Sequence, residues 1–238
     1  MTCISIGHGP HPRSGGAAGV GSGIATYTDP VPAARPGPSL PGQHLTLGPR
    51  AVLVPVKAFG EAKRRLHRAM TGPERAELSR AMADRVVGAA HPLPLAVVCD
   101  DVDVAEWARN RGALVVWEPG RGLNGAVEAG VARLGDAGVV QVTVAHADLP
   151  RATDLADVGR ADGITLVPDR WGNGTNVIAL PTDAGFHFSY GPGSFARHRA
   201  EAARLGLVCH VLDRPDLAYD VDEPGDIVPV ATARPSSA

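Results

Sequence analysis

Residues 139–150, which read VVQVTVAHADLP, join a short apolar run to a loop that carries an aspartate and a proline. The run 139–145 is rich in β-branched residues and short for a helix, so it predicts a buried strand. Asp148 follows at the tip of this strand, and Pro150 restricts the backbone just beyond it. Nucleotide-binding α/β folds commonly place a metal ligand at such a position. We therefore expect Asp148 to be a metal ligand or, alternatively, a cap for the segment after Pro150.

Similar short runs recur on both sides of this stretch. They predict strands at 51–56, 95–98, 114–117, 164–167, 176–180 and 208–212, and helical patterns between them predict helices at 74–90, 103–111, 124–134 and 194–205. Thr71-Gly72-Pro73 precedes the first of these helices and predicts its cap and start. Strands that alternate with helices of this length favour an α/β fold with a doubly wound, mostly parallel sheet. Ligands in such sheets bind beyond the carboxyl ends of the strands, near the point where the strand order reverses.

The composition excludes several classes of protein. The chain has 238 residues, of which 44% are hydrophobic and 20% charged, and its formal net charge is −2. This near-neutral charge argues against a nucleic-acid-binding surface, and no apolar run approaches the ~20 residues that span a bilayer. Three scattered cysteines fit neither a disulfide framework nor a zinc site. We therefore expect a cytoplasmic protein with no nucleic-acid or membrane partner.

The two ends of the chain differ from its middle. Residues 1–48 hold 10 of the 29 glycines and 7 of the 21 prolines but few large apolar or charged side chains, which predicts a disordered extension. A wrongly assigned translation start is the alternative. One domain is expected over 49–230, followed by a loose tail at 231–238. A homodimer remains open, because no exposed apolar stripe indicates an oligomeric state.

The loop after the first predicted strand is strongly basic. Residues 55–66 read PVKAFGEAKRRL and supply Lys57, Lys63, Arg64 and Arg65. Such cations suit a triphosphate, and a loop between a strand and a helix adds free backbone N–H groups. The loop lacks the glycine pattern of a P-loop, so a solvated basic stretch is the alternative.

Two more loops contain possible nucleotide and metal contacts. Gly122, Leu123 and Asn124 follow the third strand, where glycine permits close approach of the backbone and Asn124 can cap the next helix or bind a base or ribose. Asp220 and Asp222 lie on one side of an extended segment. Together with Asp148 they would form an all-oxygen site suited to Mg²⁺, whereas solvated loop carboxylates are the alternative.

The densest polar stretches are PDRWGNGTN at 168–176 and SYGPGSF at 189–195. Their glycines free the backbone to wrap an anion, while Thr175 and Ser194 supply hydroxyl groups. Ser194 also opens a predicted helix, whose N-terminus favours a phosphate or carboxylate. A hairpin turn and an N-cap are the structural alternatives. His198 and the pair Asp100–Asp101 are left outside the predicted site. A structural or solvated role explains a lone histidine on a helix, and a cap for the next helix explains the two aspartates.

The order of these motifs resembles a known family. PVKAFGEAKRRL, GLN, ADLP, PDRWGNGTN, YGPGSFARH and DVDEPGD occur collinearly over nearly all of 51–227. They resemble the CofC/FbiD guanylyltransferases of coenzyme F-420 biosynthesis. The resemblance implies a single Rossmann-like nucleotidyltransferase domain that joins the phosphate of a three-carbon acid to GMP from GTP and releases pyrophosphate. The acid is phosphoenolpyruvate, 2-phospho-L-lactate or 3-phospho-D-glycerate, and the Ala/Arg/Gly-rich composition favours phosphoenolpyruvate by its association with high-GC bacteria.

The resemblance also implies roles for individual residues. The metal-binding aspartates fall on Asp148, Asp220 and Asp222, and the acid contacts fall on Thr175, Gly191 and Ser194. The GTP-binding elements match the basic loop with Lys57, Lys63 and Arg65 and the turn Gly122-Leu123-Asn124. His146 departs from the family, which more often has proline or a small residue there.

Two rival functions are weighed against this expectation. Related transferases that act on a molybdopterin or a sugar phosphate usually have a glycine-rich loop after the first strand, and this chain has PVKAFGEAK there. A catalytically inactive nucleotide-binding regulator would be expected to lose the carboxylates at the metal positions, yet all three are present. Both comparisons favour an active guanylyltransferase that uses Mg²⁺.

Overall fold

The computed structural model describes residues 47–227. The predicted disorder of the N-terminal extension and the predicted loose tail therefore fall almost wholly outside the described residues. Leu47, the first of these residues, packs against one of the two large apolar clusters. Among the described residues, none of the helices has the length and apolar character needed to cross a membrane.

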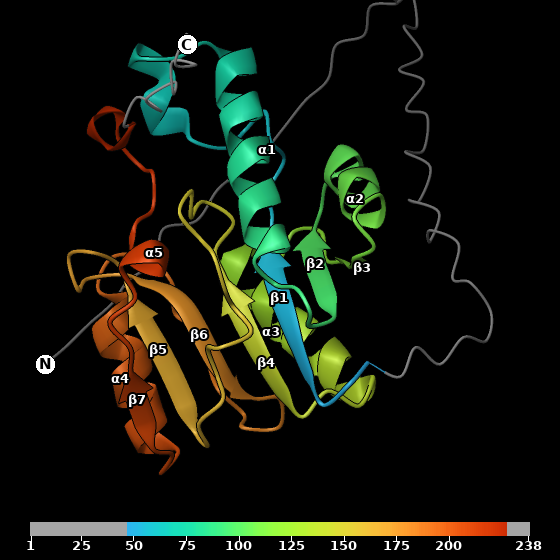
Figure 1. Cartoon of the computed structure of the whole chain (residues 1–238), viewed down its shortest axis with the longest axis vertical. Helices are drawn as coiled ribbons and strands as arrows, with labels where there is room; N and C mark the ends of the chain where they lie inside the picture. Colours follow the sequence, from blue (N-terminus) through green and yellow to red (C-terminus); the bar gives the residue numbers. More distant parts are fainter. Residues whose placement is uncertain (1–46, 228–238) are drawn as a thin grey trace, which may run out of the picture. The chain divides into compact units, whose positions relative to one another are not determined.

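Seven strands form one mixed sheet (Figure 1). They are β1 Arg50–Pro55, β2 Leu95–Cys99, β3 Leu114–Trp117, β4 Gln141–Ala145, β5 Ile164–Pro168, β6 Thr175–Pro181 and β7 Cys209–Val211. Their order is β3-β2-β1-β4-β6-β5-β7. β6 is antiparallel to its neighbours β4 and β5, and the other neighbouring pairs are parallel. The predicted α/β class and mostly parallel sheet are confirmed, and the strand order reverses between β1 and β4.

The helices and short turns complete the fold. They are η1 Arg64–Arg68, α1 Gly72–Gly88, α2 Val102–Arg109, α3 Gly122–Asp136, α4 Ser194–Arg204, α5 Pro215–Ala218 and η2 Pro224–Asp226. Predicted strands and longer helices agree with the structure to within two residues at each end. The short elements η1, α5 and η2 were not predicted, because three to five residues show no hydrophobic period.

Alternating residues of β1 serve two separate cores. Val52 and Val54 pack in a cluster with residues of α1 and α2, whereas Ala51 and Leu53 pack in a second cluster with residues of α3 and α4. Successive side chains of a strand point to opposite faces, so helices must cover both faces of this sheet. The result is a three-layer arrangement in which β1 and β4 are central.

The contact between α3 and the sheet requires a glycine. A Cβ atom at Gly130 would lie 2.7 Å from Leu53 Cδ2, which is closer than carbon atoms can pack. Leu53 is completely buried, so its side chain has little room to move. Gly130 therefore allows α3 to lie close to β1.

The start of α1 follows its local sequence. The Thr71 side chain accepts a hydrogen bond from Glu74 N, while the Glu74 carboxylate accepts one from Thr71 N at 2.7 Å. This capping box satisfies two N–H groups that a helix otherwise leaves unpaired. The predicted cap and helix start at Thr71-Gly72-Pro73 are confirmed.

Candidate functional site

A pocket opens where β1 and β4 end. Its volume is about 200 Å³, and it is lined by Pro55, Val56, Lys57, Phe59, Ala62, Lys63, Ser79, Met82, Leu123, His146, Ala147 and Asp148. Pockets for whole drug-sized ligands usually measure about 300–1,000 Å³. This cavity therefore accommodates only part of a ligand as large as a nucleoside triphosphate, and the ligand's remainder would extend over the neighbouring loops.

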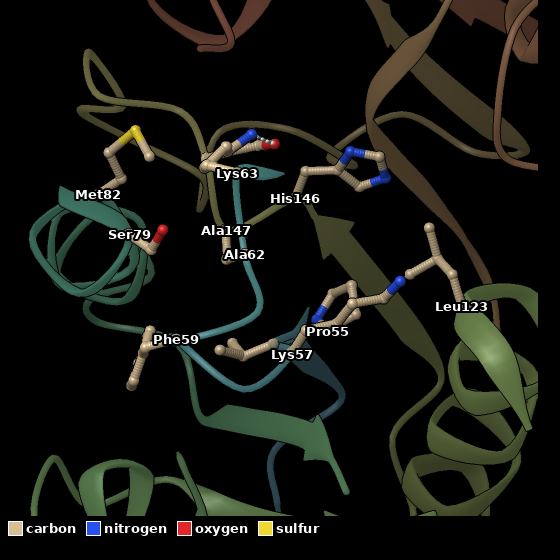
Figure 2. A pocket seen from close by; sticks show the side chains of 12 residues that line it. Pro55, Lys57, Phe59, Ala62, Lys63, Ser79, Met82, Leu123, His146 and Ala147 are labelled. Atoms are coloured by element: carbon tan, nitrogen blue, oxygen red, sulfur yellow. Dashed lines mark hydrogen bonds and ion pairs between the residues drawn. The ribbon is translucent and has the colours of Figure 1, made fainter. Parts of the chain in front are cut away.

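Lys63 makes the central ion pairs of this region. Its Nζ donates to Asp148 Oδ2 at 2.5 Å and to Asp222 Oδ1 at 2.9 Å, although these residues lie far apart in the sequence. The dashed line at the Lys63 ammonium in Figure 2 marks the contact with Asp148. The Lys63 side chain is only 10% exposed. Burial alone would lower the pKa of this ammonium, but the two carboxylates raise the pKa above its ordinary value and keep the group charged.

Asp148 lies at the tip of the central strand β4, as predicted. Burial opposes its ionisation, yet the charges of Lys63 and His146 and the hydrogen bond from Lys63 hold the pKa of the carboxyl below its usual range. Its second oxygen, Oδ1, is buried and has no hydrogen-bond partner among residues 47–227. An ionised carboxylate with an unpaired buried oxygen is suited to accept a further cation or donor.

The segment with Asp220 and Asp222 is held next to Asp148. Val221 N donates to Asp148 O at 3.3 Å, and the Val221 side chain packs with Leu66 and Met82. Burial and the nearby charges of Asp148 and Asp222 raise the pKa of Asp220. The fold thus brings the three predicted aspartates into one neighbourhood. Within residues 47–227, however, no three His, Cys, Asp or Glu side chains stand close enough to form a ready metal site.

Arg170 and Asp226 position this acidic segment, and the sequence analysis did not identify either residue. Arg170 donates to Asp220 O at 2.9 Å and pairs with the Asp226 carboxylate. Asp226 Oδ2 in turn accepts from Asp222 N at 2.9 Å and from Glu223 N at 2.8 Å. The signal available in the sequence was the arginine inside PDRWGNGTN and the last aspartate of DVDEPGD, but nothing local showed that they meet.

Thr175, Ser194 and His198 form a buried polar cluster between the start of β6 and α4. Ser194 Oγ accepts from Thr175 N at 3.0 Å, and the Thr175 hydroxyl lies 3.0 Å from His198 Nδ1. The side chains of Thr175 and Ser194 are almost fully buried, and His198 is fully buried. Ser194 opens α4, as predicted. This cluster joins β6 to α4, and it gives His198 a structural role inside the fold, which was one of the two roles expected for it.

The turn Gly122-Leu123-Asn124 begins α3. Arg121, not Asn124, occupies the N-cap, so the expectation that Asn124 caps this helix was wrong. Asn124 Oδ1 instead accepts from Tyr190 N at 2.8 Å and so joins α3 to the loop that contains Gly191. Leu123 lines the pocket, whereas Gly122 and Gly191 are exposed glycines with positive φ.

The remaining cations of the first loop differ in position. Lys57 is exposed, lines the pocket and lies on a different side of it from Lys63 in Figure 2. Arg65 lies exposed on η1, outside the pocket lining. Asp101 caps α2 by accepting from Val104 N at 3.0 Å, so the structure gives it the capping role.

His146 also faces the pocket. Its ring lies 4.7 Å from that of Tyr190, measured between centroids, and its backbone N donates to Asn176 O at 3.0 Å. Its Nε2 atom and the Tyr190 hydroxyl are buried without hydrogen-bond partners in the described part of the chain. The departure from the expected proline or small residue therefore places an aromatic ring beside Asp148.

Several proteins have similar sequences. The phosphoenolpyruvate guanylyltransferases of Rubrobacter xylanophilus and Roseiflexus castenholzii are 36% and 34% identical to this chain. Each alignment covers 74% of this chain and 90% or 85% of the relative. The 2-phospho-L-lactate guanylyltransferase of Methanocaldococcus jannaschii is 26% identical over 74% of this chain and 80% of that protein.

Solved structures and a family model complete the comparison. A structure described as a nucleotide-diphospho-sugar transferase from Desulfovibrio desulfuricans superposes with a TM-score of 0.57 at 18% identity, covering 74% of this chain and 84% of that one, which supports the fold alone. The family model described as "Guanylyl transferase CofC like" matches residues 50–232. This match spans the strands, the pocket and all six motifs, so the chain belongs to the CofC family of guanylyltransferases, as its resemblance to the enzymes of coenzyme F-420 biosynthesis predicted.

Proposed function

We propose that this guanylyltransferase transfers GMP from GTP to the phosphate of phosphoenolpyruvate, with release of pyrophosphate. The observation that carries the proposal is the meeting of Lys63, Asp148 and Asp222 beside the pocket at the carboxyl ends of β1 and β4. Bringing two phosphate groups together requires positive charge and alignment, and this edge of the sheet supplies both cations and carboxylates. The relatives named phosphoenolpyruvate guanylyltransferase favour this acid over the other two.

The carboxylates at this site fit Mg²⁺. Asp148, Asp220 and Asp222 offer hard oxygen ligands, and the buried, unpaired Asp148 Oδ1 is available to a cation. Burial, together with the nearby charges of Asp148 and Asp222, raises the pKa of Asp220, and a divalent cation would offset the repulsion among the three carboxylates. When bound, Mg²⁺ would neutralise and align the phosphate oxygens of GTP and of the acceptor.

The chain's own residues would then bind and orient the two substrates. Lys57, Lys63 and Arg65 neutralise the phosphates of GTP, and the turn Gly122-Leu123-Asn124 contributes to the nucleotide site. Lys57 and Leu123 line the pocket, which supports these two roles most directly. No general base is required, because a phosphate dianion already carries the electron pair that attacks the α-phosphorus.

The acid is assigned to the region around Thr175, Gly191 and Ser194. Gly191 is exposed, so its backbone is accessible to a small anion. The hydroxyls of Thr175 and Ser194 are nearly buried and bonded within the protein, which supports a role in shaping the loops that hold the acid. Phosphoenolpyruvate, 2-phospho-L-lactate and 3-phospho-D-glycerate all carry a phosphate and a carboxylate on three carbons, so the shape of this region must discriminate among them.

A coupled pyrophosphatase assay tests the proposal. With GTP, Mg²⁺ and each acid in turn, we expect the highest kcat/KM with phosphoenolpyruvate. Asp148→Asn should lower kcat/KM by about a hundredfold or more, because it removes charge at the reacting centre. Asp157→Asn is the matched control, since Asp157 lies exposed and pairs only with Arg160 among the described residues. Preference for another acid would overturn the substrate assignment, and full activity of Asp148→Asn would overturn the site.

A further inference from the structure

The gap between Asp148 and Asp222 already contains a cation, the ammonium of Lys63. It contacts one oxygen of each carboxylate, Asp148 Oδ2 and Asp222 Oδ1. These are two of the three residues that the proposed function gives to Mg²⁺. An ammonium and a dication that share the same carboxylates would also repel each other over a few ångströms. The two cations therefore compete for the same place.

The backbone presents Lys63 to this gap. Lys63 has a φ of 54°, a left-handed conformation that residues other than glycine adopt only when their surroundings impose it. Leu66 N donates to Lys63 O at 2.9 Å, and the fully buried Leu66 packs with Met82 and Val221. The neighbourhood of the acidic segment thus also fixes the position of the lysine. Only the flexible four-carbon side chain is free to move.

We propose that Lys63 and a divalent cation are alternative occupants of the gap between Asp148 and Asp222, so that Lys63 must leave before the metal can bind. The inference rests on the proposed function, because it takes Asp148 and Asp222 as metal ligands. In the absence of metal, Lys63 holds the two carboxylates together and offsets their repulsion. On release, its ammonium becomes available to the phosphates of GTP, on the pocket that it already lines.

The exchange couples metal binding to nucleotide binding. Without nucleotide, a metal ion must displace Lys63 and leave that charge without its two partners, so metal binding is weak. With GTP, the phosphates offer the displaced ammonium a new partner and the metal additional oxygen ligands. By linkage, each ligand then strengthens the binding of the other.

Isothermal titration calorimetry with MgCl₂ alone tests the competition. Lys63→Met removes the ammonium and keeps an unbranched side chain, so we expect it to bind Mg²⁺ about tenfold or more tightly than the unaltered protein. Lys63→Arg keeps a cation and should bind Mg²⁺ no more tightly than the unaltered protein. Lys57→Met is the matched control, because it removes one positive charge from the same pocket, and Lys57 forms no ion pair within the described chain. Its effect should be much smaller.

Each result decides the inference. Equal or weaker Mg²⁺ affinity in Lys63→Met overturns it, as does the absence of binding, because removal of the competitor should open the site. An equal gain in Lys57→Met also overturns it, since net charge would then explain the effect. If Lys63→Met does not fold, Lys63→Gly provides a second neutral variant whose backbone adopts a positive φ without strain.

A different experiment would overturn the proposed function. Its failure appears as full pyrophosphate release by Asp148→Asn, a variant in which Lys63 is unaltered. If Asp148→Asn is inactive while Lys63→Met and the unaltered protein bind Mg²⁺ equally, only the exchange is overturned.

Discussion

The imidazole of His198 lies 3.0 Å from the Thr175 hydroxyl, in a fully buried position where α4 packs on β6. Ser189 N donates to His198 Nε2 at 3.0 Å, and a backbone N–H can only donate. His198 Nε2 is therefore an acceptor, and Nδ1 carries the proton of the neutral ring and donates it to Thr175. This arrangement has no place for a second ring proton.

The stability of the fold should therefore fall in mild acid. Burial, together with the charges of Arg197 and His146, lowers the pKa of His198 from 6.5 to about 4. Above pH 6.5 the His198 imidazole is neutral in both the folded and the unfolded chain, so the free energy of unfolding has its full value there. As the pH falls from 6.5 to 4, the imidazole becomes protonated in the unfolded chain but stays mostly neutral in the folded chain. The free energy of unfolding should therefore fall by about 3 kcal/mol in total. Urea denaturation at a series of pH values measures this loss.

His198→Gln isolates the effect. Glutamine stays neutral and offers both a hydrogen-bond donor and an acceptor. In His198→Gln the free energy of unfolding should therefore fall less steeply between pH 6.5 and 4, because the contributions of all other groups are the same in both proteins. Identical slopes for the two proteins would show that His198 titrates normally in the folded state.

Arg170 should act on the reaction through the acidic segment that it holds. Arg170→Met removes the bonds to Asp220 O and to the Asp226 carboxylate, which leaves Asp220 and Asp222 less well positioned. Loss of such supporting contacts typically lowers metal affinity or activity by about 10–100-fold. We expect Mg²⁺ affinity measured with GTP present and kcat to fall together. Arg160→Met, which removes an exposed arginine, is the control. Unchanged Mg²⁺ affinity in Arg170→Met would rule out the positioning role.

Gly130→Ala should destabilise the fold, although alanine is the better helix former. The new Cβ would lie 2.7 Å from Leu53 Cδ2 inside the core, and such overpacking costs about 1–3 kcal/mol. Gly88→Ala is the matched control, because a Cβ at Gly88 meets nothing within 4 Å. That variant should be unchanged or more stable by up to about 1 kcal/mol. Thermal unfolding of both variants provides the comparison, and an equally stable Gly130→Ala would show that α3 shifts freely on the sheet.

Removal of residues 1–46 should leave the guanylyltransferase activity within about twofold, because this segment contains none of the six motifs and has few large apolar side chains. Removal of residues 1–49 should destabilise the fold. Pro49 O accepts from Val140 N at 2.9 Å and from Gln141 N at 3.0 Å, and Leu47 packs against the core. Loss of these contacts should lower the free energy of unfolding by about 1–3 kcal/mol. A large loss of kcat/KM in the shorter deletion would assign the extension a role in the reaction.

The sequence by itself determined the local elements and the family. The strand at 114–117 has the bounds that its apolar run predicts, and α1 begins at the cap that Thr71-Gly72-Pro73 predicts. These features depend on residues a few positions apart, and hydrophobic periodicity and capping report such short-range interactions directly. Six collinear motifs identified the family for a similar reason, since a motif is also a local pattern.

Only the tertiary structure decided which of these local features meet. Lys63 bonds to Asp148 and Asp222, which lie 85 and 159 residues further along the chain, and Arg170 pairs with Asp226 across 56 residues. The antiparallel course of β6 and the burial of His198 were likewise absent from any local pattern. Such contacts depend on strand order and on the packing of both faces of the sheet, which periodicity does not encode. For this reason the sequence showed four cations in the basic loop but not which of them has a carboxylate partner. Only the fold shows that Lys63 lies between the carboxylates of Asp148 and Asp222.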